Sequence, residues 1–175
     1  VKYTGEGADP YAALVQKAAG ANRTLVLECA DADAAKAALA VCKDGKPILN
    51  GANPDNYEAM NAIATEAGVT LGVTADTLDA LYDTVAALEK AGNKNLVLDV
   101  GTASVKDAFS KAVLIRRAAL KDQDRTFGYP SIVNIGELAA GDPQMQAALA
   151  AVFTLKYGSI LVMEDMSYAQ ALALY

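Results

Sequence analysis

The chain has 175 residues, of which 53% are hydrophobic, and its formal net charge is −6 at pH 7. This length and composition are typical of a globular chain with one core, and the negative charge disfavours binding to nucleic acids or to anionic membranes. The sequence contains no histidine, which excludes Ser-His and Cys-His nucleophiles. Because no apolar stretch reaches the roughly 18 residues of a membrane span, and because no signal peptide is visible at residues 1–10, we expect a cytoplasmic protein.

Short apolar runs that end at a polar residue recur along the chain, and the segments between them have apolar residues at helical spacing. In chain order, we predict strands at 1–3 (the end of a strand), 24–30, 47–53, 69–75, 95–101, 131–136 and 159–165. The helices are predicted at 10–20, 32–43, 54–67, 77–91, 104–121 and 142–156, and a last one begins at Ser167. We expect Asp9 to cap the first helix, with Pro10 at its first position. Alternation of strands and helices requires parallel pairing with right-handed crossovers.

This order of elements predicts an α/β fold, specifically a (β/α)8 TIM-type barrel truncated at both ends, with strands 2 to 8 present. We expect residues 1–175 to form a single barrel domain fragment. The alternative is an open doubly wound sheet. That fold usually carries a glycine-rich phosphate loop after its first strand, and neither GxGxxG nor GxxxxGK[ST] occurs here. The barrel is therefore favoured.

The two cysteines, Cys29 and Cys42, have no CxxC spacing. This arrangement specifies neither a disulfide framework nor a zinc or iron-sulfur site. We predict that both are buried free thiols.

In six of the predicted strands the apolar run stops at a polar residue. These residues are Glu28, Asn50, Thr74, Asp99, Asn134 and Glu164. In a parallel barrel they would share one rim, where carboxylates and amides suit a neutral heterocycle with N–H donors or, alternatively, a hard cation. The acidic residues Glu137, Glu164 and Asp165 would repel a phosphate. The structural alternative is that each rim side chain caps the following helix or binds loop amides.

Four segments of the chain resemble the barrel domain of the large (gamma) subunit of the corrinoid iron-sulfur protein, which belongs to the acetyl-CoA decarbonylase/synthase system. The segments are KAVLIRRAALKDQDRTFGYPSIVN (111–134), KYGSILVMED (156–165), PILNGANPDNYEAM (47–60) and NLVLDVGT (95–102). The resemblance covers nearly all of the chain.

The resemblance implies a non-catalytic scaffold and docking barrel. In this family the protein carries a methyl group from methyltetrahydrofolate, by way of a methyltransferase, to acetyl-CoA synthase in the reductive acetyl-CoA pathway. The implied partners are the small subunit of the corrinoid protein, the methyltransferase and acetyl-CoA synthase. The iron-sulfur and corrinoid-binding domains of the parent protein are absent from this chain. We therefore expect the corrinoid and the four-iron cluster in the parent protein, and no cofactor bound by this fragment.

The barrel is also similar to pterin-binding methyltransferase barrels, in which acidic and amide side chains hold the pterin ring. The matching positions are Glu28, Asn50, Asp99 and Asn134. Glu28 departs from the pattern, because aspartate is expected there and the longer side chain would crowd a flat ring. The resemblance thus leaves an alternative function, a pterin-binding methyltetrahydrofolate methyltransferase acting on a corrinoid. In that case Asp99 and Asn134 would bind the pterin, and Asn50 would assist transfer at the methyl-bearing nitrogen.

A third possibility is a divalent-metal lyase. It would use the carboxylates Glu28, Asp99 and Glu164 as ligands.

Overall fold

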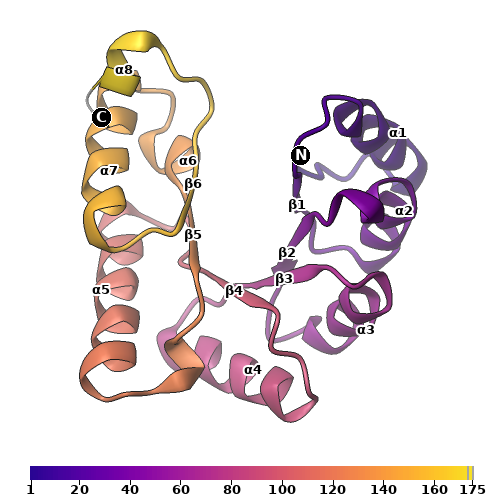
Figure 1. The fold of residues 1–175 in the computed structure, drawn as a ribbon, viewed down its shortest axis with the longest axis horizontal. Helices are drawn as coiled ribbons and strands as arrows, with labels where there is room; N and C mark the ends of the chain where they lie inside the picture. Colours follow the sequence, from indigo (N-terminus) through magenta and orange to yellow (C-terminus); the bar gives the residue numbers. More distant parts are fainter. Residues whose placement is uncertain (173, 175) are drawn as a thin grey trace. The chain divides into compact units, whose positions relative to one another are not determined.

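The computed structural model describes residues 1–172 and residue 174. Its described strands are β1 (Val26–Glu28), β2 (Ile48–Ala52), β3 (Thr70–Val73), β4 (Leu96–Asp99), β5 (Ser131–Asn134) and β6 (Ile160–Val162). The main helices are α1 (Ala8–Ala19), α2 (Ala32–Cys42), α3 (Tyr57–Ala67), α4 (Leu78–Lys90), α5 (Val105–Lys121) and α7 (Pro143–Lys156). Shorter helical segments are η1 (Lys43–Gly45), η2 (Arg125–Phe127), α6 (Ile135–Ala139) and α8 (Tyr168–Leu172). Strands and helices alternate along the chain (Figure 1).

The strands follow one another in the sheet in sequence order, β1-β2-β3-β4-β5-β6. Strand β2 pairs in parallel with β1 and β3, and β5 pairs in parallel with β4 and β6. A doubly wound sheet reverses its strand order at a switch point, whereas a TIM-type barrel keeps it consecutive. The predicted α/β fold with TIM-type strand order is therefore confirmed.

The chain divides into two compact units, Val1–Val97 and the part from Leu98 onward, so that β4 crosses the division. Each unit has its own packed core. A single barrel domain over the whole chain stays a prediction.

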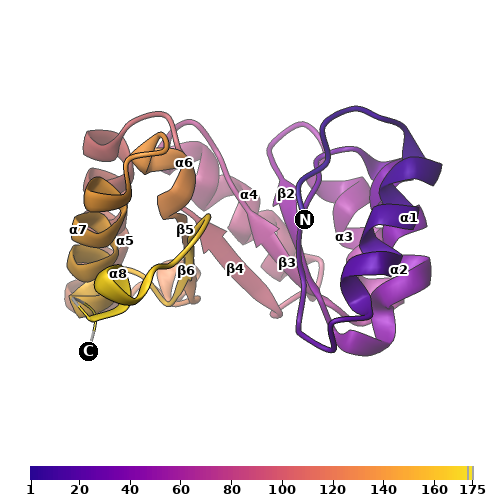
Figure 2. The same cartoon turned by 90° about the horizontal axis from the view of Figure 1, so that it is seen from above.

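In the first unit, the core lies between the strands and their helices. Its fully buried side chains include Tyr11, Leu27, Leu49, Met60 and Leu71. In this unit α1, α2 and α3 lie along one side of the strands (Figure 2). Strands of a parallel sheet that are covered by helices typically consist of near-continuous apolar runs, as these do.

The predicted strand at residues 1–3 forms only a single parallel bridge, between Lys2 and Glu28. The N–H of Glu28 donates to the carbonyl of Val1 at 2.9 Å, and the N–H of Tyr3 donates to the carbonyl of Glu28 at 2.8 Å. This segment therefore pairs along the outer side of β1, as expected, over a shorter length.

In the second unit, β5 pairs with β4 on one side and with β6 on the other. Leu98 on β4 and Val133 on β5 are fully buried. Helices α5 and α7 belong to the same unit. These two helices are in contact, because the rings of Phe109 on α5 and Phe153 on α7 lie 6.0 Å apart between centroids in an edge-on arrangement.

Three details of the predicted elements were wrong. Helix α1 begins at Ala8 after Gly7, and no side chain caps it, so Asp9 lies within the first turn and is not the cap. Strand β5 ends at Asn134, and α6 takes the place of the predicted strand end. Strand β6 ends at Val162, three residues before the predicted end.

Within the described residues, no helix is both long and apolar enough to cross a membrane.

Candidate functional site

Of the residues predicted for the rim, Glu28, Asp99 and Asn134 end their strands and Asn50 lies within β2, whereas Thr74 and Glu164 follow the ends of β3 and β6. In the first unit, Glu28 ends β1 and is in register with Asn50 on β2, which in turn is in register with Gly72 on β3. The structure therefore brings Glu28 and Asn50 together on adjacent strands. Asn50 is only 5% exposed.

A glycine on β3 makes the position of Asn50 possible. A Cβ atom built on Gly72 would overlap the side-chain Oδ1 of Asn50 and would lie 3.0 Å from its Cα. Gly51 is a second close approach, because its φ is +143° and a Cβ there would overlap the carbonyl oxygen of Cys29. Both glycines allow neighbouring backbone to come closer than any side chain would permit.

Two asparagines that the sequence reasoning missed organise the loops next to Asn50. The side-chain Nδ2 of Asn56 donates to the carbonyl of Ala30 at 2.8 Å and to that of Gly51 at 3.1 Å. Its Oδ1 accepts from the N–H of Asn53 at 2.7 Å. Asn56 thus ties the loop after β1 to the end of β2. The only signal in the sequence is the pair of asparagines three residues apart after a strand.

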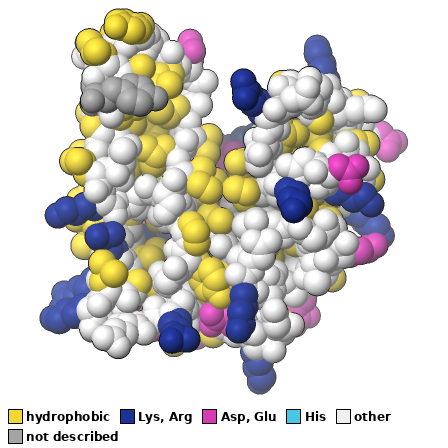
Figure 3. Space-filling view, viewed as in Figure 1, with side chains coloured by type: hydrophobic (Ala, Val, Ile, Leu, Met, Phe, Trp, Pro, Cys, Tyr) yellow, Lys and Arg dark blue, Asp and Glu magenta, His cyan; other side chains and the backbone are white. Residues whose placement is uncertain are grey.

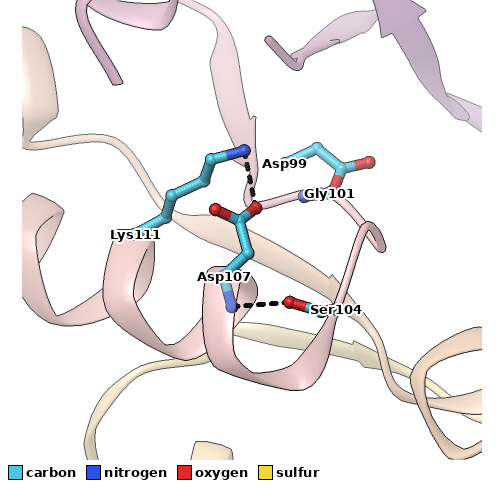
Figure 4. A network of polar contacts seen from close by, with 5 residues as sticks. All are labelled: Asp99, Gly101, Ser104, Asp107 and Lys111. Carbon is cyan, nitrogen blue, oxygen red and sulfur yellow. Dashed lines mark hydrogen bonds and ion pairs between the residues drawn. The ribbon is translucent and has the colours of Figure 1, made fainter. Parts of the chain in front are cut away.

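In the second unit, the carboxylate of Asp99 at the end of β4 binds its own loop. Its Oδ1 accepts a hydrogen bond from the N–H of Gly101 at 2.8 Å (Figure 4). Helix α5 then begins with Ser104 as its cap, because the Oγ of Ser104 accepts from the N–H of Asp107 at 3.0 Å. Asp99 and Ser104 thus accept hydrogen bonds from backbone N–H groups that have no partner within a helix or strand.

A buried ammonium lies on α5, one turn after Asp107. The Nζ of Lys111 forms an ion pair of 3.0 Å with Oδ2 of Asp107, and Lys111 is 7% exposed (Figure 4). The sequence reasoning did not single out Lys111. Its i, i+4 spacing from an aspartate was the available signal.

Asn134 caps the short helix that the sequence reasoning missed. Its Oδ1 accepts from the N–H of Glu137 at 3.2 Å, as an N-cap does at the start of α6. Asp99 is in register with Ile132, two residues before Asn134 on β5. Asp99 and Asn134 therefore lie on adjacent strands but at different levels.

Glu164 and Asp165 lie outside β6, in the loop that follows it, so their placement within a strand at 159–165 was wrong. A buried glutamine holds this loop. Gln146 accepts from the N–H of Glu164 at 3.0 Å and donates to the carbonyl of Asp165 at 2.7 Å. The adjoining cavity of about 340 Å³ is lined by Asp142, Glu164 and Asp165 among others. Three carboxylates around it disfavour an anionic ligand.

The structure thus brings Glu28 and Asn50 into register in the first unit, whereas Asp99 and Asn134 in the second unit lie on adjacent strands but two residues out of register. Convergence of all four on one cavity stays a prediction. Among residues 1–172 and 174, no group of three or more His, Cys, Asp or Glu side chains is placed to hold a metal ion.

Both cysteines are buried free thiols, as predicted. Burial raises the pKa of Cys29 and of Cys42 above the ordinary value. Burial also raises the pKa of Tyr11, with a further contribution from the nearby thiols. These groups therefore favour the protonated state in the folded protein.

Residues 1–174 match the protein family described as "CO dehydrogenase/acetyl-CoA synthase delta subunit". Among curated relatives, the corrinoid/iron-sulfur protein large subunit of Moorella thermoacetica is 38% identical over 152 residues, which is 87% of this chain and 33% of that protein. The acetyl-CoA decarbonylase/synthase complex subunit gamma 2 of Methanosarcina thermophila is 33% identical, over 90% of this chain and 36% of that protein. The chain thus spans about a third of the length of these relatives.

A crystal structure of dihydropteroate synthase from Thermus thermophilus superimposes with a TM-score of 0.71 at 20% identity, covering 99% of this chain and 79% of that one. This likeness supports the TIM-type fold alone. The resemblance inferred from the sequence segments is confirmed by the family match and the curated relatives together, and the chain belongs to the CO dehydrogenase/acetyl-CoA synthase delta subunit family.

Proposed function

We propose that this chain is a scaffold and docking barrel within a corrinoid iron-sulfur subunit of an acetyl-CoA decarbonylase/synthase complex. The names of its relatives support this assignment. In such a protein a methyl group passes from methyltetrahydrofolate, through a methyltransferase, to the corrinoid and then to acetyl-CoA synthase. The proposed partners are the small subunit, the methyltransferase and acetyl-CoA synthase, in the cytoplasm.

The chain's own residues do not fit a four-iron cluster. Such a cluster takes four cysteine thiolates, whereas this chain has two cysteines, both buried as free thiols. Under the proposal, the cluster and the corrinoid are held by other parts of the longer protein. The barrel contributes position and contact surface.

The observation that carries the proposal is that the strand-end acceptors already serve the protein's own backbone. Oδ1 of Asp99 accepts from the N–H of Gly101, and Oδ1 of Asn134 accepts from the N–H of Glu137. A pterin that used the same oxygens would have to compete with these hydrogen bonds, each worth about 0.5–1.5 kcal/mol net. Structural use of the rim favours a scaffold over a ligand site.

The second candidate is a pterin-binding methyltransferase barrel. It is favoured by the order of polar side chains on β1, β2, β4 and β5, which are Glu28, Asn50, Asp99 and Asn134. An acid, an amide, an acid and an amide in this order could bind a neutral ring with several N–H donors.

Calorimetry with 5-methyltetrahydrofolate separates the two candidates. The scaffold proposal predicts no saturable heat for the complete chain, whether wild type or Asp99→Asn. Micromolar binding that is lost in Asp99→Asn would instead establish the pterin site, because that substitution keeps an oxygen acceptor for Gly101 and removes the charge and the second acceptor oxygen. A positive control is co-expression with the small subunit, from which the scaffold proposal expects a stoichiometric complex.

A further inference from the structure

A small groove on the second unit has an unusual charge pattern for so acidic a chain. It has a volume of about 170 Å³ and lies between α5, the connector after it and the end of α7. Its apolar lining includes Ile115, Leu120 and Phe127, and its charged residues are Arg116 and Lys156. No Asp or Glu is among the described residues that line it. The chain as a whole carries a net charge of −6, so a carboxylate-free groove with two cations stands apart from the rest.

The guanidinium of Arg116 is held in place by the backbone. Its Nη1 donates to the carbonyl oxygen of Lys156 at 3.1 Å, which joins the middle of α5 to the last residue of α7. Within residues 1–172 and 174, neither Arg116 nor Lys156 forms an ion pair with a carboxylate. An arginine has five N–H donors in a planar fork that suits a carboxylate. The groove therefore offers a partly pre-organised binding site for a carboxylate.

The outer side of α7 is also apolar. On the outer side of α7, Met145, Val152 and Leu155 are 46%, 42% and 80% exposed, and Ala148 lies between them at the same helical spacing. The opposite side of the helix is buried through Leu149 and Phe153. A helix that is apolar on both sides is typical of one covered on both sides. Over α5 and α7, Figure 3 shows yellow and dark blue side chains with very little magenta.

We propose that the groove lined by Arg116, Leu120, Phe127 and Lys156, here called the α5–α7 face, docks a protein segment that presents an Asp or Glu carboxylate between apolar side chains. The proposal rests on the docking function above and specifies its surface. Charge complementarity selects this occupant, since the carboxylate would pair with Arg116 and Lys156 while its apolar neighbours cover Leu120 and Phe127.

Two other occupants fit the observations less well. In a symmetric dimer the same patch of each copy meets itself, so Arg116 and Lys156 would face a surface without a carboxylate. A nucleic acid would be repelled by the net charge of −6. The apolar side chains of the α5–α7 face also form no contacts with phosphates.

Zero-length crosslinking of the assembled complex tests the proposal. A carbodiimide joins a lysine amine only to a carboxylate in direct contact, so Lys156 should couple to an Asp or Glu of another polypeptide, next to apolar residues in its sequence. The crosslink should vanish in Lys156→Arg, which keeps the charge but has no amine to couple. Lys94, an exposed lysine of the first unit, serves as the control. The proposal is overturned if Lys156 in the intact complex stays fully open to amine acetylation, or if it couples only to another copy of this chain.

Charge reversal gives an independent readout. Arg116→Glu with Lys156→Glu should weaken assembly about tenfold or more, whereas Arg23→Glu with Lys94→Glu, which makes the same charge change on the first unit, should leave it within about twofold. An intact complex with unchanged affinity in the first pair would contradict the α5–α7 face and leave the scaffold function standing. Failure of the wild-type chain to join any complex would contradict the scaffold function itself.

Discussion

The carboxylate of Asp99 accepts a hydrogen bond from the N–H of Gly101, two residues further along the chain, at 2.8 Å. Gly101 has a φ of +77°, so the backbone turns sharply at this point. The side chain that the sequence marks as a pterin contact is therefore also the one that holds the turn after β4. Substitutions at Asp99 can separate its role in the turn from a role in binding a pterin.

Asp99→Ala should lower the free energy of unfolding by about 1–2 kcal/mol, because the N–H of Gly101 loses its acceptor in a half-buried turn. Asp99→Asn should lose well under half of that, since its Oδ1 can take over the hydrogen bond. Urea denaturation of both variants measures the difference. Equal losses would show that the charge, and not the acceptor, stabilises the turn.

Gly72→Ala should destabilise the first unit by about 1–3 kcal/mol, because the new methyl group would overlap Oδ1 of buried Asn50. Gly45→Ala is a matched control, since nothing lies within 4 Å of a Cβ built there. That control should be neutral or slightly stabilising. Thermal unfolding of the two variants should therefore move in different directions, and similar midpoints would refute the tight contact between β2 and β3.

Asn134→Ala should lower stability by about 1 kcal/mol through loss of the cap on α6. Asn134→Asp keeps an oxygen that can accept from the N–H of Glu137, so this variant should retain most of the stability that the cap provides. The measurement is chemical denaturation followed by helical circular dichroism. A cap role is wrong if the aspartate variant is as unstable as the alanine variant.

Stability should fall as the solution becomes alkaline. Burial raises the pKa of Cys29 and Cys42 in the folded state, so the folded state binds more protons than the unfolded state above the ordinary thiol pKa of about 8.5. The stabilisation from these neutral thiols is complete below that pH and is lost as the pH rises toward the folded values. Free energies of unfolding between pH 7 and 10.5 should show a decline that is smaller in Cys29→Ala with Cys42→Ala. The same slope in both proteins would contradict the assignment.

The strand order was predictable because each apolar run is short, ends at a polar residue and is followed by a helical pattern, which leaves few topologies. The short helix α6 was missed because its first signal, the Asn134 cap, also fits a polar strand end. Asn56 was missed for a different reason. Its partner Ala30 lies 26 residues away, and no local spacing reports such a contact.

The rim itself was only partly predictable. The sequence alone places Glu28, Asn50, Asp99 and Asn134 at the ends of apolar runs. In the structure Glu28, Asp99 and Asn134 end their strands, and Asn50 lies within β2. Whether each oxygen serves a ligand or the backbone depends on loop geometry, which composition and periodicity do not encode. Asp99 and Asn134 prove to be bonded to the backbone of the following loop or helix.

The most direct test of the scaffold account is the rate of methyl transfer from methyltetrahydrofolate to the corrinoid, measured with the methyltransferase and the complete subunit that contains this chain. The account predicts that Asp99→Asn and wild type differ by less than about twofold in kcat/KM, since no binding energy for the transition state comes from this carboxylate. A loss of about a hundredfold or more in Asp99→Asn, with the subunit still folded and assembled, would contradict it and assign the reaction's pterin to this barrel.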